Sequence, residues 1–426
     1  MPSRAIWVTK GTYNVTGTLQ FPNADVVRNG ATIVLDGAGS AIQWTTGTNA
    51  LANFASNSGS LTVKNGKALA TKAFTNTGTV VIGPGSNSSL TSPGSGYTQS
   101  GGGSSTALTA ASSKLASSAA SGNVTINGGI LSGIGTVQTA GGQSLVNAAA
   151  VSPGTSPGIL SATANYSQSA GGSLPIQIGG TTVGTQYDRL AVTGNASLNG
   201  SLDLSTINGF TPSAGQSFTI LTYTGTRTGT FSAITGDTLC SIGIHYQVVY
   251  DDAGKQVRLD AKLAPPVVTG YSKAAQAVGK KITVLGSCFT GATQVAFTKA
   301  GGGTVNGTGM QVLSDTQISV KVPNLAATGP VSVTGPGGTG VGPILKIKAT
   351  ILDFNPKSGP VGTQVILTGT AFTGVSKVLF GTTKAVFTLD SDGQITTTVP
   401  AGAITAVITI TTPGGKAKTK VVFTVT

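Results

Sequence analysis

The feature that most constrains this chain is an internal repeat in its C-terminal part. Two stretches, 83 residues apart, carry Gly, Val and Phe at the same spacing: Gly279, Gly286, Phe289, Gly291, Val295 and Phe297 correspond to Gly362, Gly369, Phe372, Gly374, Val378 and Phe380. After an offset of six residues the copies match again, Val322-Pro323 with Val399-Pro400 and 336–338 with 413–415. Each copy alternates short apolar runs with Gly and Pro, which predicts a small antiparallel β-sandwich of about 80–100 residues.

Composition favours β-structure throughout the 426 residues, a length that suits two to four domains. All 12 acidic residues are Asp, so Glu, a strong helix former, is missing, while the chain holds 63 Gly and many Thr, Ser and Val residues. The one Ala-rich run, 104–121, is mostly Ser, Ala and Gly, and we interpret it as a loop or a short decoration. The sequence predicts an all-β protein.

The first 263 residues have a different rhythm from the repeat. Short apolar runs such as 31–35, 59–63, 78–82 and 123–126 alternate with turns rich in Gly, Asn and Thr. Strand signals spaced by about 15–25 residues suit a parallel β-solenoid, in which each coil buries its apolar positions against its neighbours.

Residues 123–231 resemble the repeat associated with bacterial autotransporter passengers and haemagglutinin-like adhesins. The matching segments are 128–137, 151–158, 187–194, 209–212 and 215–221. The resemblance implies a right-handed parallel β-helix displayed outside a bacterium, which we place at residues 1–263.

The two C-terminal copies resemble immunoglobulin-like IPT/TIG domains. Ser358-Gly359-Pro360-Val361-Gly362 and the segment 366–372 carry the resemblance in the second copy, and 278–279 with 285–289 in the first. In the first copy Ala275-Gln276-Ala277 replaces the Ser-Gly-Pro turn. The resemblance implies two Ig-like domains, 264–348 and 349–426, of a kind that serves as spacers and binding modules on bacterial surface proteins.

The net charge of +13 is concentrated in the C-terminal part. Residues 1–263 hold 12 Lys+Arg and 8 Asp, whereas 264–426 hold 13 Lys, no Arg and 4 Asp. Such a surface attracts anionic polymers such as cell-surface polysaccharide. Without Arg or interleaved aromatics it does not predict specific nucleic-acid binding, and the lysines also protect sheet edges. No apolar run approaches the roughly 20 residues of a transmembrane helix.

Groups suited to catalysis are sparse. His245 is the single histidine and lies in an alternating, strand-like segment, where a polar face position explains it. Asp251-Asp252 and the segment 390–393 have the chemistry of hairpin turns, and Asp188 could pair with Arg189 on the solenoid. We predict no enzymatic activity, no metal site and no cofactor.

The two cysteines leave two possibilities open. A disulfide between Cys240 and Cys288 would suit an exported protein and would tie the last solenoid strands to the first sandwich. Two buried free thiols are the alternative.

These observations favour an extracellular, non-enzymatic structural protein of a bacterial surface, either an adhesin or a filament subunit. The strand-prone segments 7–15 and 419–425 predict an open first coil and a free last strand, which suit head-to-tail self-association. A polysaccharide-binding or polysaccharide-degrading β-helix with Ig-like accessory domains is the first alternative. A virus tail or capsid fibre is the second.

Overall fold

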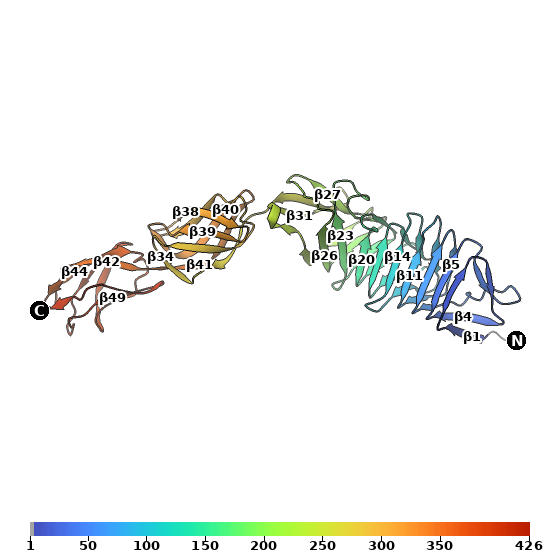
Figure 1. The fold of residues 1–426 in the computed structure, drawn as a ribbon, viewed down its shortest axis with the longest axis horizontal. Coiled ribbons are helices and arrows are strands. Elements are labelled where there is room, and N and C mark those ends of the chain that lie inside the picture. Colours follow the sequence, from blue (N-terminus) through green and yellow to red (C-terminus); the bar gives the residue numbers. More distant parts are fainter. Residues whose placement is uncertain (1–3) are drawn as a thin grey trace. The chain divides into compact units, whose positions relative to one another are not determined.

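A computed structural model describes residues 4–426 as an all-β protein, with one short 3₁₀-helix and no α-helix in that range (Figure 1). The residues form two compact units. One comprises the residues up to Thr238 together with Tyr246–Ala261, and the other comprises Leu239–His245 with Lys262–Thr426. No helix among the residues described here is long and apolar enough to cross a membrane.

The first unit is built from long parallel sheets whose neighbouring strands are third neighbours in the chain. The first sheet contains β1 (Arg4–Val8), β4 (Ala24–Asn29), β7 (Ser56–Asn57), β10 (Phe74–Asn76), β13 (Gly96–Gln99), β16 (Asn123–Ile126), β19 (Ser144–Asn147), β22 (Asn165–Gln168), β25 (Ala196–Leu198) and β28 (Arg227–Gly229). The second contains β2 (Thr12–Val15), β5 (Thr32–Asp36), β8 (Ser60–Lys64), β11 (Thr79–Ile82), β14 (Ser105–Leu108), β17 (Ile130–Gly133), β20 (Ala150–Pro153), β23 (Ser173–Ile178), β26 (Ser201–Thr206) and β29 (Ala233–Thr235).

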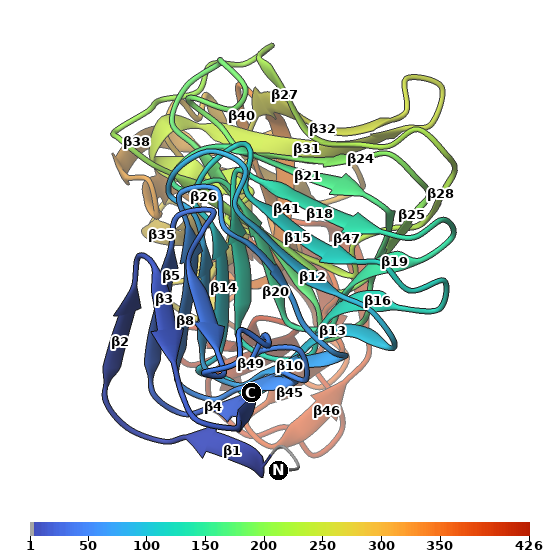
Figure 2. The ribbon, with the colours of Figure 1, turned by 90° about the vertical axis from the view of Figure 1, so that its right-hand side faces the viewer.

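The third sheet takes every third strand as well, each following a strand of the second sheet in the chain. Its parallel strands are β9 (Ala68–Ala70), β12 (Ser89–Ser92), β15 (Lys114–Ser117), β18 (Thr136–Thr139), β21 (Ile159–Thr163), β24 (Arg189–Val192) and β27 (Ser217–Thr222). The hairpin of β31 (Ile244–Asp251) and β32 (Gln256–Leu263) extends it, with β32 antiparallel to β27. The short β3 (Thr18–Gln20) and β6 (Ala41–Gln43) pair separately. Figure 2 shows β2 and β5 on one side of the unit and β12 and β15 on another.

The core of this unit consists of rows of buried side chains that lie in register on neighbouring strands. Along the second sheet, residues in register are all at most 1% exposed: Ile33, Leu61, Val80, Thr106, Leu131 and Val151. Each strand is too short to bury its own side chains, so its apolar residues are covered by those in register on the neighbouring strands. Burial of this kind stabilises by about 25 cal/mol per Å² of apolar surface.

The Ala-rich run 104–121 belongs to this core, so its interpretation as a loop was wrong. It forms β14 and β15, and Leu108 and Leu115 are fully buried at inward positions. Small Ser and Ala residues are tolerated on either face of a strand. The two leucines are in register with residues of the adjacent strands, and this determines which face of β14 and β15 is buried.

A buried row of amides runs across the first sheet, from the last residues of β4, β7 and β10. Asn29 Nδ2 donates to Asn57 Oδ1 at 2.8 Å, and Asn57 Nδ2 donates to Asn76 Oδ1 at 2.9 Å. The same amides donate to backbone carbonyls of the following strands, those of Ser60, Thr79 and Ser105. Because each buried amide has its partners, the ladder fixes the register of successive turns without an unpaired polar group.

The second unit contains two pairs of sheets, each around its own apolar core. The first pair consists of β33 (Val267–Tyr271), β35 (Lys281–Ser287), β39 (Gln317–Lys321) and β38 (Thr308–Ser314), facing β34 (Ala275–Ala277), β41 (Gly338–Lys348), β40 (Ala326–Gly335), β36 (Gln294–Lys299) and β37 (Thr304–Asn306). The second consists of β42 (Thr350–Asn355), β44 (Gln364–Thr370), β48 (Gln394–Thr398) and β47 (Phe387–Ser391), facing β46 (Thr383–Ala385), β45 (Lys377–Phe380), β49 (Ile408–Thr412) and β50 (Gly415–Lys418). β43 (Ser358–Gly359) pairs with β51 (Thr424–Val425).

The repeated glycines have a shared structural cause. A Cβ on Gly286 would lie 1.9 Å from the carbonyl oxygen of Val267, and one on Gly369 would lie 2.1 Å from that of Thr350. Each glycine therefore lets two strands approach while a phenylalanine, Phe289 or Phe372, fills the space beside it and is fully buried. The sequence repeat marks a repeated packing arrangement.

The two cysteines are joined in this unit. Cys240 opens the 3₁₀-helix η1 (Cys240–Ile242), which follows β30 (Thr238–Leu239) in the chain, and its disulfide partner Cys288 follows β35. The Cα atoms lie 4.4 Å apart. Leu239–His245 accordingly cluster with Lys262–Thr426.

Candidate functional site: a groove on the first parallel sheet

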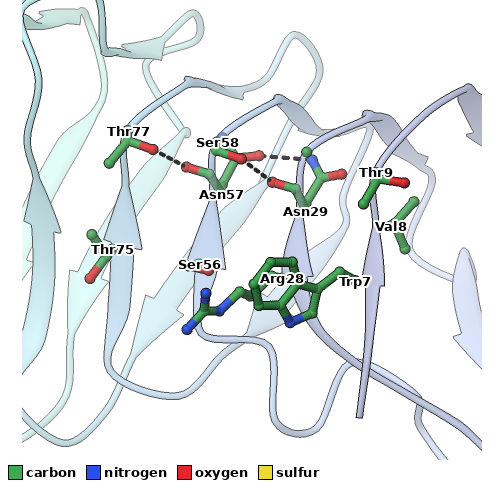
Figure 3. A pocket seen from close by; sticks show the side chains of 11 residues that line it. Trp7, Val8, Thr9, Arg28, Asn29, Ser56, Asn57, Ser58, Thr75 and Thr77 are labelled. Carbon is green, nitrogen blue, oxygen red and sulfur yellow. Dashed lines mark hydrogen bonds between the residues drawn. The ribbon is translucent and has the colours of Figure 1, made fainter.

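A groove of about 640 Å³ crosses β1, β4, β7 and β10 of the first sheet (Figure 3). Its walls carry the aromatic Trp7, the cationic Arg28 and a series of small polar side chains, Thr9, Ser56, Ser58, Thr75 and Thr77. The volume lies in the range of ligand sites. The lining is mostly polar, with Trp7 as its aromatic side chain.

Trp7 is 60% exposed although it is among the largest apolar side chains. An exposed tryptophan within a hollow is informative, because a protein gains stability by burying such a ring against its own core. The groove thus leaves more than half of the Trp7 surface accessible to a ligand.

A β-bulge sets the positions of Trp7 and Arg28. Ile6 is opposite Val26 but Trp7 is opposite Arg28, so Val27 is an extra residue in β4. After this insertion Asn29 points inward to the amide ladder and is 1% exposed, while Arg28 points outward beside Trp7. Bulges re-aim side chains in this way and occur often beside functional sites.

The guanidinium of Arg28 stacks on the indole of Trp7. Its Cζ lies 4.5 Å from the centroid of the ring, within the range of a cation–π contact. The contact holds two long side chains in one arrangement before any ligand arrives, which lowers the entropy that binding would cost.

The opposite wall of the groove is fixed by hydrogen bonds to the backbone. Ser58 Oγ donates to the carbonyl of Asn29 at 3.1 Å, and Thr77 Oγ1 donates to that of Asn57 at 3.3 Å. Each hydroxyl uses its proton in this bond and keeps lone pairs that can accept from a ligand hydroxyl. The amide ladder below holds the same backbone, so the wall is rigid.

The polar residues singled out from the sequence lie elsewhere and have structural partners. Asp251 accepts from the Gly254 N–H at 2.8 Å, as expected for a hairpin turn, and Asp252 is paired with Arg227 at 2.8 Å. His245 lies in β31. None of them contributes to the groove.

The segment 390–393 is also a turn, with a defined role. Asp392 Oδ1 accepts from Thr373 N at 3.0 Å, and the second carboxylate oxygen accepts from Ala371 N at 3.2 Å. Asp315 binds the corresponding loop of the first sheet pair through Cys288 and Thr290. Within residues 4–426 no three His, Cys, Asp or Glu side chains are grouped so that they could share a metal ion.

Asp188 does not pair with Arg189, contrary to the suggestion from their adjacency. It is fully buried, and its carboxylate oxygens accept from Gly158 N at 2.7 Å and from Gln177 N at 2.8 Å. Burial raises its pKa to about 6, against the opposing effect of these two bonds. Asp188 immediately precedes β24, which begins at Arg189, and its two hydrogen bonds hold it in the interior while Arg189 is only partly buried.

Sequence reasoning missed the groove. Trp7 entered it only as part of an expected open strand, and Arg28 was not considered. The bulge at Val27 brings Trp7 and Arg28 together. Its one trace in the local sequence is a pair of adjacent valines, Val26 and Val27, before Arg28.

Comparison with known proteins identifies part of the chain. The family model described as "IPT/TIG domain" matches residues 349–425. Residues 349–425 form an IPT/TIG domain. The prediction for the second copy is thereby confirmed, whereas the assignments of the first copy and of the passenger-like repeat stay predictions. No curated protein matches the chain.

Similar solved structures include surface glycan-binding proteins and a nutrient-binding protein. SGBP-B from a complex xyloglucan utilization locus in Bacteroides uniformis is 20% identical, with 37% of this chain and 49% of that chain covered and a TM-score of 0.19. The surface glycan-binding protein from Prevotella bryantii is 15% identical over 37% of this chain and 40% of its own, with a TM-score of 0.25. An auxiliary nutrient binding protein from Bacteroides thetaiotaomicron is 25% identical over 18% and 21%, with a TM-score of 0.17. The chain thus spans less than half the length of each, and likenesses this remote carry no argument about function.

Proposed function

We propose that this protein is an extracellular glycan-binding protein whose ligand site is the groove at Trp7. The observation that carries the proposal is an exposed indole inside a hollow lined by hydroxyl groups. A sugar ring has one face of C–H groups, which can lie on an aromatic ring, and a rim of hydroxyls, which need hydrogen-bond partners. The groove offers both at once.

The proposed location outside the cell rests on the disulfide. The bond between Cys240 and Cys288 belongs to proteins that mature in oxidising compartments, because cytosolic thiols are kept reduced. An IPT/TIG domain at residues 349–425 suits a spacer that holds a binding unit away from a surface.

Within this proposal the three sheets close into a right-handed parallel β-solenoid over residues 1–263. The strand order, in which every third strand is a neighbour, supports it. Residues 264–348 form a second Ig-like domain in tandem with 349–426, supported by their separate apolar cores and the shared packing of Gly286 and Gly369.

Glycan binding takes precedence here over the adhesin or filament role that the sequence favoured first. The groove is a feature that a purely structural rod does not need, whereas head-to-tail assembly and the virus-fibre alternative stay predictions without such an observation. Binding without catalysis is part of the proposal, since the groove lining contains no Asp or His side chain that could act as an acid or base.

Native affinity gels containing soluble polysaccharides, neutral and acidic, test the proposal. At least one polysaccharide should retard the protein, and Trp7→Ala should weaken that binding by about tenfold or more, as for a central aromatic contact. Trp7→Phe keeps an aromatic face and should retain part of the affinity.

Val386→Ala is the control, because Val386 is also an exposed apolar residue, 84% exposed, but lies between β46 and β47, outside the lining of the groove. It should bind as the wild type does. Failure of every polysaccharide to retard the protein, or equal retardation of Trp7→Ala and wild type, would overturn the proposal.

A further inference from the structure

The Arg28 guanidinium is the one charged group in the lining of the groove. Among the residues described here it forms no hydrogen bond or ion pair, and its contact is the stacking on Trp7. Asp25, on the same strand, accepts from Asn53 Nδ2 at 2.9 Å. Arg28 therefore presents an uncompensated positive charge to whatever occupies the groove.

Stacking leaves the hydrogen-bonding capacity of Arg28 intact. The five N–H donors of a guanidinium lie in its plane, and a ring that covers one face of that plane blocks none of them. The indole thus orients the fork while its donors stay available at the edge. Ser56 and Thr75, the residues next in register along the sheet, are small and leave space beside that edge.

The geometry points to an acidic glycan as the ligand, and we propose that one sugar ring lies on Trp7 while an anionic substituent is bound by Arg28. This inference rests on the proposed glycan-binding function and specifies its ligand class. A planar fork of donors matches two oxygens of a carboxylate or of a sulfate ester, and such charge-assisted pairs are stronger than neutral hydrogen bonds. A uronic acid or a sulfated sugar carries those oxygens at the rim of its ring, next to the face that would stack.

Pairs of glycans that differ only in charge separate the effect of the anionic group on binding from the effect of the shape of the sugar. Short oligouronates are compared with their methyl esters, and sulfated dextran oligomers with unmodified ones, by calorimetry at near-physiological ionic strength. One acidic form should bind about tenfold or more tightly than its neutral counterpart, and Arg28→Gln should remove that difference. The pair that shows the difference tells whether the anion is a carboxylate or a sulfate.

Arg28→Lys and Lys420→Gln are the controls. Arg28→Lys keeps the charge but not the planar fork, and should retain only part of the preference. Lys420→Gln removes one positive charge from the basic second unit and should leave binding unchanged, which excludes general attraction of polyanions.

The outcomes distinguish this inference from the function on which it rests. If no glycan binds, the proposed function fails and the acid preference with it. If a neutral glycan binds as well as its acidic counterpart and Arg28→Gln has no effect, glycan binding stands and the acid preference is overturned. An equal loss of binding in Arg28→Gln and Lys420→Gln would also overturn it.

Discussion

Asp188 shows how one buried carboxyl can make stability depend on pH. Its side chain is fully buried in the first unit and joins two segments through the backbone N–H groups of Gly158 and Gln177. Its pKa is raised to about 6 from an ordinary value of 3.8, mainly because burial disfavours the charge. A carboxyl whose pKa is higher in the folded state stabilises the fold most below its unfolded pKa, and that contribution is lost as the pH rises through the folded pKa.

Asp188→Asn should remove this pH dependence. We expect the free energy of unfolding of the wild type to gain about 2–3 kcal/mol relative to the variant as the pH falls from 7 to 4, because two pKa units correspond to that amount. Urea denaturation of both proteins at several pH values measures the difference. Carboxyls with lowered pKa, such as Asp251 and Asp252, are present in both proteins and cancel. A constant difference across this range would contradict the assignment.

At the same scale, the sequence identified polar residues but not their partners. It placed Asp251 and Asp392 in turns, where they are, because Asp with Gly is strong local turn chemistry. Trp7 and Arg28 escaped notice because their contact joins two turns of the chain and depends on one extra residue, Val27. Such contacts have no local signature.

At the scale of elements, the repeat predicted more than composition did. Gly286 and Gly369 mark equivalent close contacts between strands, and Cys288 and Ala371 occupy equivalent positions with φ of 57° and 59°. The second copy thus shows that alanine fits this backbone. What distinguishes the copies is that Cys288 is covalently joined to η1.

Because Ala371 occupies the position equivalent to Cys288, a variant without the disulfide can carry alanine at residue 288. Cys240→Ser combined with Cys288→Ala should lower the free energy of unfolding of the second unit by about 4 kcal/mol, the chain-entropy value for cysteines 48 residues apart. Thermal and denaturant unfolding under oxidising conditions measure the change. Peptide mapping without reduction provides the control for the bond itself, and two free thiols in natively isolated protein would contradict it.

At the scale of the whole molecule, the sequence predicted an all-β protein, as the structure has it. Alternating residues such as those of 59–63 and 78–82 became parallel strands because inward Leu and Val positions stack between turns. The segment 239–245 was expected to continue the first domain, yet it belongs to the compact unit that contains the disulfide. Strand periodicity says nothing about which neighbour a short linking segment contacts.

The central claim is that Trp7 contacts a bound glycan, and a chain with only two tryptophans allows a direct test. Trp44 donates its indole N–H to the Ala24 carbonyl, so Trp44→Phe leaves Trp7 as the single indole at the cost of one hydrogen bond. That variant is titrated with the polysaccharide that retards the wild type, while its fluorescence is recorded. We expect a saturable shift of Trp7 emission to shorter wavelength, with the same midpoint as calorimetric binding. Calorimetric binding without any change in Trp7 emission would contradict it.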